Sequence, residues 1–199
     1  MIKRLIFCTL FLVVASTGFT HGKWVLEKNA NGVQVFTREN DNSSIKEFKA
    51  VATVFADRLD IARCVSRVTD YPNWFPDCGE SRIIDIISPT KRKTYYKVDL
   101  PWPATDRYCY MIMHVETDDA KKETTIHFND TDGEEVDGCV RMANADGFWR
   151  ITTLDDKRTK VIYQFISDPA GALPAWIINM FIVDNPYDAL MALKKKLEK

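Results

Sequence analysis

Apolar and polar residues alternate over most of the chain, in short runs separated by turn residues. Residues 33–38 alternate directly after the turn signal Asn31-Gly32, and residues 45–55 mix alternation with β-branched side chains. Alternation of this kind is typical of strands with one buried face. Residues 133–144 lack a clear period, and we expect a loop there. Further strands, in an antiparallel meander with about ten residues between turns, are predicted at residues 82–88, 93–100, 108–117, 123–129, 148–154 and 161–167.

Two segments have helical spacing instead. Residues 57–69 repeat apolar positions every three or four residues, and the helix must end before Pro72, because proline cannot continue it. A stripe of apolar residues predicts a long C-terminal helix that begins at Pro174. Asn185-Pro186 should kink this helix or split it in two. The predicted architecture is one domain of strands wrapped by a long C-terminal helix.

The strand over residues 108–113 is apolar on both faces. A strand in a half-solvated sheet should alternate with polar residues. We therefore expect one face to pack against a helix. The other face would border a ligand cavity, whose shape flexible methionine can follow, or a solid core. The two faces consist of Tyr108, Tyr110 and Ile112 on one side and of Cys109, Met111 and Met113 on the other.

The first two turns of the C-terminal helix are also apolar nearly all round. Between Trp176 and Val183 only Asn179 is polar. A helix that covers a sheet needs one apolar face, so Ile178 and Ile182 are left over. Either loops cover them, or they face a membrane or a lipid during exchange.

The N-terminal residues have the layout of a secretory signal peptide. Lys3 and Arg4 precede an apolar run over residues 5–15, and small residues follow. The run is too short to span a bilayer, which takes about 20 residues. We expect residues 1–22 to be cleaved and residues 23–199 to form the exported domain, periplasmic or secreted. An uncleaved anchor or a buried first helix is the alternative.

Charge and cysteine content narrow the function further. Loss of the two basic signal residues leaves 25 Lys and Arg against 28 Asp and Glu, a net charge of −3. This balance gives no electrostatic argument for nucleic acid or for an anionic membrane surface. Four cysteines remain after export, and one or two disulfides are plausible in an oxidising compartment. Among the pairings we favour Cys64 with Cys78; the alternative is that some, including Cys109 and Cys139, are small buried apolar residues.

No catalytic or metal-binding set is evident. His114 and His127 fall on different strands without a second ligand at metal spacing. The serines have no nucleophile motif around them, and glycine is too scattered for a phosphate loop. Most aspartates sit where turns need them. We expect no metal, no cofactor and no enzymatic activity.

Several segments, in order along the chain, resemble the START (steroidogenic acute regulatory protein-related lipid transfer) domains of the helix-grip, Bet v 1-like superfamily. The resemblance implies an α+β fold in which a curved antiparallel β-sheet wraps a long C-terminal α-helix around an internal apolar cavity for one lipid. The helix and the neighbouring loop would act as its lid. The segments are Trp24 with Gly32-Val33-Gln34-Val35, Tyr71-Pro72-Asn73-Trp74, Leu100-Pro101-Trp102-Pro103 followed by Asp106, and residues 159–179.

The resemblance also implies a set of ligand-binding residues. Many members have Arg-Asp where this chain has Thr105-Asp106, and the strand that follows offers no charged anchor. This favours a weakly polar, sterol-like ligand. We expect Arg150 at the surface, because an unpaired buried charge is costly; the alternative is that it supplies one polar contact to the ligand. The cavity floor would comprise Cys109, Met111 and Met113, the lid Ile177 and Phe181, and the remaining contacts Tyr96, Trp102, Trp149 and Tyr163.

Three functions remain open. The first is a monomeric, non-enzymatic protein that binds or transfers a lipid and contacts membranes transiently. The second is a helix-grip enzyme, cyclase- or hydratase-like, acting on an apolar polyketide-type substrate. It would need an acid–base pair in the cavity, for which His114, or Tyr96 with Asp99, are the candidates. The third is a secreted protein that only sequesters an apolar metabolite.

Overall fold

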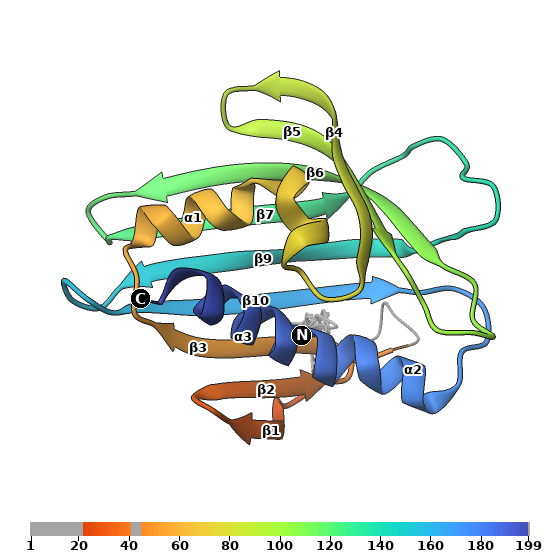
Figure 1. Cartoon of the computed structure of the whole chain (residues 1–199), viewed down its shortest axis with the longest axis horizontal. Coiled ribbons are helices and arrows are strands. Elements are labelled where there is room, and N and C mark those ends of the chain that lie inside the picture. Colours follow the sequence, from red (N-terminus) through yellow and green to blue (C-terminus); the bar gives the residue numbers. More distant parts are fainter. Residues whose placement is uncertain (1–21, 41–44, 199) are drawn as a thin grey trace, which may run out of the picture.

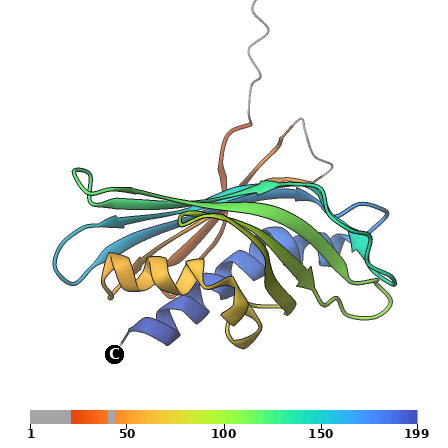
Figure 2. The same cartoon turned by 90° about the horizontal axis from the view of Figure 1, so that it is seen from above.

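Ten strands form one curved sheet in the computed structural model, which describes residues 22–40 and 45–198 (Figures 1 and 2). The order is β1-β2-β3-β10-β9-β7-β6-β5-β4, all neighbours being antiparallel, and the short β8 pairs in parallel with β6. The strands are β1 (Val25–Ala30), β2 (Val33–Arg38), β3 (Glu47–Val54), β4 (Cys78–Ser88), β5 (Lys91–Val98), β6 (Arg107–Asp118), β7 (Glu123–Asp130), β8 (Val140–Arg141), β9 (Ala143–Thr153) and β10 (Thr159–Asp168).

The helices all lie on the concave face of this sheet (Figure 2). The chain leaves β3 through α1 and η1, reaches the far edge at β4, and returns strand by strand until β10 pairs with β3. The C-terminal helix then crosses the concave face. The helical elements are α1 (Arg58–Ser66), the 3-10 turn η1 (Val68–Asn73), α2 (Ala175–Asn179), the π turn η2 (Met180–Asp184) and α3 (Asn185–Leu197). The α+β helix-grip fold predicted from the sequence is confirmed.

Local sequence explains where the elements begin and end. Asn31 and Gly32 both have positive φ, 51° and 74°, as the tight turn between β1 and β2 requires. The Asp57 carboxylate accepts the Leu59 N–H at 2.7 Å and caps α1. The segment over residues 133–144, predicted as a loop, contains β8 and the start of β9. β8 forms beside β6, where the Val140 N–H donates to the Asp106 carbonyl at 2.9 Å.

The predicted interruption at Asn185-Pro186 takes the form of a π turn. Pro186 lies in the first turn of α3 and has no N–H to donate to the carbonyl four residues earlier. The Asn185 N–H instead reaches back five residues to the Met180 carbonyl. The helical segment therefore runs without a break from Ala175 to Leu197 but is widened between α2 and α3.

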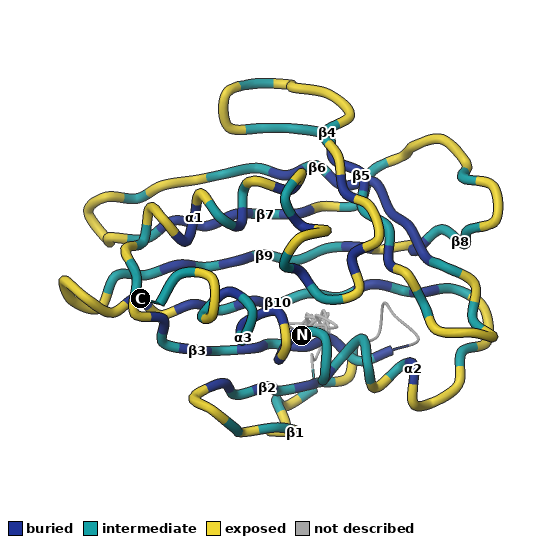
Figure 3. Tube along the Cα trace, viewed as in Figure 1, coloured by how far each residue is buried: buried dark blue, intermediate teal, exposed yellow. Residues whose placement is uncertain are grey.

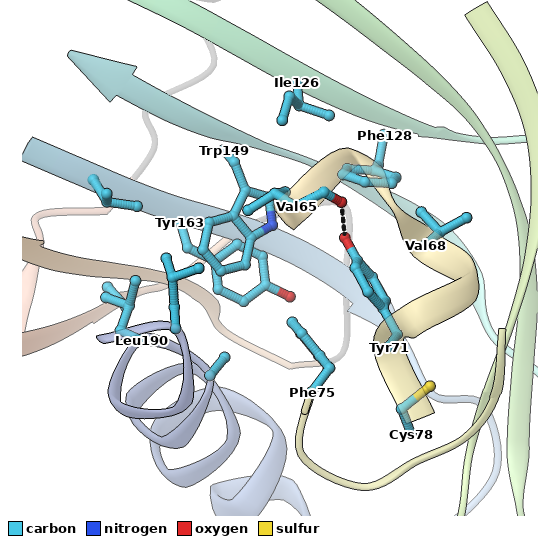
Figure 4. Packing of buried hydrophobic residues seen from close by; sticks show 14 of the residues in the cluster. Val65, Val68, Tyr71, Phe75, Cys78, Ile126, Phe128, Trp149, Tyr163 and Leu190 are labelled. Carbon is cyan, nitrogen blue, oxygen red and sulfur yellow. Dashed lines mark hydrogen bonds between the residues drawn. The ribbon is translucent and has the colours of Figure 1, made fainter. Parts of the chain in front are cut away.

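The main core lies between the concave face and the helices, where Figure 3 shows the buried parts of the chain and Figure 4 the packed side chains. Ile61 and Val65 of α1 and Leu190 of α3 are fully buried in it. Each such side chain contributes about 1.5–3 kcal/mol to the free energy of unfolding. The core fixes the helices on the sheet, and the cavity described below lies beside it.

The two-sided apolar strand β6 is explained by a second, smaller cluster on the convex face. Tyr95, Tyr108 and Tyr110 are buried there and pack against Val136 and Cys139 of the loop between β7 and β8. That loop lies so close that a Cβ on its Gly133 would come within 2.0 Å of the Tyr110 ring. Loop residues therefore cover one face of β6, while Cys109 and Met111 on the other face border a cavity.

The predicted disulfides are not formed. The four cysteines among the described residues are free thiols, so the favoured pairing of Cys64 with Cys78 is wrong. Burial raises the pKa of both thiols, that of Cys78 to about 12, and both pack against the core as small apolar groups. Cys109 and Cys139 pack in different clusters, one on each face of the sheet.

The predicted signal peptide, residues 1–22, lies outside the described residues except for Gly22. Among the helices of the described part of the chain, none is both long enough and apolar enough to cross a membrane.

Candidate functional site

An apolar cavity lies between the concave face of the sheet and the C-terminal helix. Its empty space, including the part that opens to solvent, is about 740 Å³. The lining residues are Ile45, Lys46, Phe48, Tyr71, Phe75, Tyr96, Val98, Cys109, Met111, Phe128, Met142, Trp149, Tyr163, Phe165, Ile166, Ser167, Phe181, Ile182 and Asn185.

Aromatic rings form much of the cavity wall (Figure 4). Trp149 of β9 and Tyr163 of β10 are register partners and stack with their ring centroids 4.2 Å apart. The Phe75 ring, from the loop between η1 and β4, lies 5.0 Å from Tyr71, 5.9 Å from Tyr96 and 6.1 Å from Tyr163. The Phe75 backbone N–H donates to the Tyr71 carbonyl at 2.8 Å, which directs this loop inward. Phe75 therefore links the rings of Tyr71, Tyr96 and Tyr163 in the cavity wall.

The polar groups inside the cavity are uncharged. The Tyr71 hydroxyl donates to the Val65 carbonyl at 2.7 Å. Burial raises the pKa of Tyr71, Tyr96 and Tyr163 above the ordinary value, so all three are protonated at neutral pH. Burial likewise raises the pKa of the Cys109 thiol, which is therefore no thiolate nucleophile.

The polar residues at the edge of the cavity are tied to the surrounding structure. The Lys46 Nζ lies 3.6 Å from a carboxylate oxygen of Glu39 and 4.0 Å from one of Glu27. The Asn185 side-chain amide donates to the Pro76 carbonyl at 3.2 Å and to the Asp77 carboxylate at 3.3 Å. The two hydrogen bonds of Asn185 join the start of α3 to the loop that carries Phe75.

Six of the nine predicted site residues line the cavity: Tyr96, Cys109, Met111, Trp149, Tyr163 and Phe181. The other three do not, and their placement corrects the prediction. Met113 is fully buried in the main core and does not line the cavity. Ile177 is fully buried in the first turn of α2, one turn before the cavity-lining Phe181. Trp102 is 91% exposed, because its loop between β5 and β6 extends beyond the sheet.

The largest omission of the sequence prediction is Phe75, with its neighbour Tyr71. The stretch from Asn73 to Gly79 is rich in aromatic residues, which is a signal for a packed loop. A loop has no periodicity, however, so the sequence does not indicate which of its rings points into the sheet.

The residues considered for acid–base catalysis do not meet in the cavity. His114 projects from the face of β6 opposite to Met111 and Met113, with its Nδ1 3.3 Å from Glu116. Asp99 forms an ion pair with Lys97, whose Nζ lies 2.6 Å from the Asp99 Oδ1, whereas Tyr96 lines the cavity. Arg150 lies 3.5 Å from Glu123 and over the Phe148 ring, so it does not supply a polar contact inside the cavity.

Comparison with known proteins agrees with this arrangement. The sequence model of the START domain matches residues 8–197. An uncharacterised protein of Pseudomonas aeruginosa is 30% identical over 179 residues, which cover 88% of this chain and 87% of that protein. A STAR-related lipid transfer protein of Xanthomonas axonopodis has a similar structure, with a TM-score of 0.79 and 25% identity, over 88% of this chain and 99% of that one.

A more distant likeness is to an enzyme. The Zhui aromatase/cyclase of Streptomyces sp. R1128 superposes with a TM-score of 0.52 and 18% identity, over 75% of this chain and 92% of that one. At this identity the likeness concerns the fold alone.

Proposed function

We propose that the chain, which belongs to the START-domain family, binds one lipid or similar apolar molecule in its cavity and leaves that molecule chemically unchanged. START domains bind lipids in a hydrophobic cavity. The observation that carries the proposal is the aromatic and aliphatic cavity on the concave face, whose interior holds no charged pair among its described lining residues. At about 25 cal/mol per Å² of buried apolar surface, such a wall binds a lipid without further directed contacts.

The proposal includes transfer between membranes. The loop between β5 and β6 and the helix α2 lie at the same end of the molecule (Figures 1 and 2). Each carries an exposed tryptophan: Trp102 is 91% exposed and Trp176 is 53% exposed. Indole rings favour the boundary between lipid headgroups and acyl chains. We propose that this end contacts a membrane transiently while η2, which carries Phe181 and Ile182, uncovers the cavity.

The chemistry of the cavity supports the hypothesis that the protein is not an enzyme. General acid–base catalysis needs groups that exchange protons near neutral pH. The three cavity tyrosines and Cys109 all have raised pKa values, and the candidate base His114 faces away. The protein would act as a monomer, with no nucleic acid, metal or cofactor as partner.

Export is part of the proposal as well. The basic start, the short apolar run and the small residues over residues 1–22 support a cleaved signal. Expression of the full chain in a Gram-negative bacterium, followed by fractionation and N-terminal sequencing, tests it. A mature N-terminus between residues 18 and 23 in the periplasmic fraction is the expected result, and an intact chain in the cytoplasm contradicts export.

The binding proposal is tested by extraction of the purified protein with organic solvent and mass spectrometry of the extract. We expect an unmodified apolar compound at close to one molecule per protein. Met111→Trp places an indole in the cavity and should empty it. Ile112→Trp, on the adjacent residue of the opposite face, is the matched control and should retain the compound. Equal lipid content in the two variants, or an extract without any apolar compound, would overturn the proposal.

A further inference from the structure

Two tyrosine hydroxyls in the cavity have no hydrogen-bond partner among the described residues. Tyr96 and Tyr163 both line the cavity, and neither oxygen is bonded to a protein group there, in contrast to the Tyr71 hydroxyl on Val65. Tyr163 is only 8% exposed, and Tyr96 is partly buried. Figure 4 shows its oxygen directed toward the space between Phe75 and Tyr71. Polar groups inside an apolar cavity are nearly always paired, so two hydroxyls that line it without a protein partner point to a ligand that supplies one.

The two hydroxyls border the same part of the cavity although their strands are far apart in the sheet. Tyr96 is on β5 and Tyr163 is on β10, with β6, β7 and β9 between them. The curvature of the sheet brings both rings onto Phe75, at 5.9 Å and 6.1 Å from its centroid. One small polar group beside Phe75 could therefore bond to both.

The surroundings of these hydroxyls are neutral. Burial raises the pKa of Tyr96, and the neighbouring groups that raise it further are Cys78, Tyr163, Cys109 and Tyr71, none of which is ionised at neutral pH. Beside Tyr163 the corresponding neighbour is Cys109. A carboxylate or phosphate placed here would meet no cation, and a buried unpaired charge is costly. The lining cation Lys46 is already close to Glu39 and Glu27.

We infer that Tyr96 and Tyr163 form the polar end of the binding site and recognise the uncharged hydroxyl or carbonyl group of the bound lipid. The inference rests on the proposed function, since it names the class of lipid that the cavity takes. Lipids with one neutral polar group are selected, and lipids with an ionised headgroup in the cavity are discriminated against. The rings can donate to a carbonyl or accept from a hydroxyl, because each tyrosine oxygen does both.

The test compares three probes of equal chain length: 1-dodecanol, dodecane and laurate at pH 8. Binding is followed by the intrinsic tryptophan fluorescence, to which Trp149, stacked on Tyr163, contributes, and by calorimetry. The double variant Tyr96→Phe with Tyr163→Phe keeps both rings and removes both hydroxyls. Tyr95→Phe is the matched control, because it removes a hydroxyl from the next residue on the convex face. We expect dodecanol to bind about tenfold more tightly than dodecane, as one net hydrogen bond implies.

The outcomes separate this inference from the proposed function. The tenfold preference should disappear in the double variant and persist in Tyr95→Phe, while dodecane binding stays the same in all three proteins. Dodecane and dodecanol binding equally to the unmodified protein would overturn the inference but leave the cavity as a lipid site. If laurate binds as tightly as dodecanol, and its affinity falls in the double variant, the preference for a neutral group is overturned. Failure of every probe to bind would overturn the proposed function itself.

Discussion

Trp149 and Tyr163 stack nearly face to face across neighbouring strands, with an angle of 12° between their ring planes. The contact needs only the rings, and the Tyr163 hydroxyl extends past it toward the cavity. Tyr71, on the opposite side of Phe75, uses its hydroxyl to hold the chain at Val65. Two tyrosines of one cavity wall therefore have different roles, one structural and one free for a ligand.

Substitution by phenylalanine should distinguish these roles. Tyr71→Phe leaves the Val65 carbonyl without its donor and should lower the free energy of unfolding by about 1–2 kcal/mol. Tyr163→Phe keeps the stack and should change it by less than about 0.5 kcal/mol. Urea denaturation followed by circular dichroism measures both. Equal losses in the two variants would show that the Tyr163 hydroxyl also supports the fold.

Arg107 holds the loop before β6 to the segment before α2. Its side chain is buried, and it donates from Nε to the Pro169 carbonyl at 2.6 Å and from Nη2 to the Ala170 carbonyl at 3.2 Å; Nη1 donates to Thr105. Arg107→Met should cost about 3 kcal/mol of stability, because several charge-assisted hydrogen bonds are lost together. Arg107→Lys should recover only part of the loss, since an ammonium lacks the planar fork.

The control for this prediction is Arg82→Met. Arg82 is half exposed and lies over the Tyr95 ring on the convex face. Its loss should cost less than about 1 kcal/mol. If the urea denaturation curves of Arg107→Met, Arg107→Lys and Arg82→Met coincide, Arg107 has no special role in stability.

Asp106 makes the stability of the same loop dependent on pH. Its carboxylate accepts the Leu100 N–H at 3.0 Å and Lys97 Nζ at 3.2 Å, and these bonds lower the pKa of Asp106 below the usual value. Because its pKa is lower in the folded than in the unfolded state, ionised Asp106 stabilises the fold at pH values above the unfolded pKa of about 4. This stabilisation is lost as the pH falls through the folded-state pKa. Asp106→Asn should therefore be less stable than the unmodified protein at pH 7, by an amount on the order of 1 kcal/mol.

The difference should shrink as the pH is lowered from about 4 toward 2. Thermal denaturation at a series of pH values measures it, with Asp132→Asn in the exposed loop after β7 as control. A difference between Asp106→Asn and the unmodified protein that stays constant over this range would contradict the assignment to the ionised carboxylate.

The sequence predicted most of the fold because its strands carry the period-two pattern of a half-buried sheet. Val33 and Val35 alternate with polar residues and are fully buried, as predicted. The resemblance to START domains added the cavity, which the apolar face of Cys109 and Met111 supported. Six of the nine predicted site residues thus line the cavity.

The errors lie where side-chain direction depends on distant parts of the chain. Trp102 stands between Pro101 and Pro103 in a loop, and the resemblance implied a ligand contact there without fixing the direction of its ring. Phe75 enters the cavity because η1 turns its loop inward, which no local period records. Met113 has the correct face of β6 but lies beyond the cavity, whose extent depends on where the C-terminal helix crosses the sheet.

The exposed Trp102 is the residue whose substitution should separate lipid binding from lipid transfer. Its ring is 91% exposed and does not line the cavity, so Trp102→Ser should change neither the stability nor the amount of bound lipid. If this end of the molecule contacts membranes, removal of an indole anchor should slow the transfer of a fluorescent lipid between neutral phosphatidylcholine vesicles by about tenfold. Trp176→Ser should act in the same direction.

Ile86→Ser is the control for general loss of exposed apolar surface. Ile86 is 68% exposed on the hairpin of β4 and β5, which projects away from α2 in Figure 1. Transfer by this variant should remain at the unmodified rate. Equal slowing by Ile86→Ser and Trp102→Ser would mean that exposed apolar area in general, and not the loop beside α2, sets the rate. Unchanged transfer by both tryptophan variants would place the membrane-contacting surface elsewhere on the molecule.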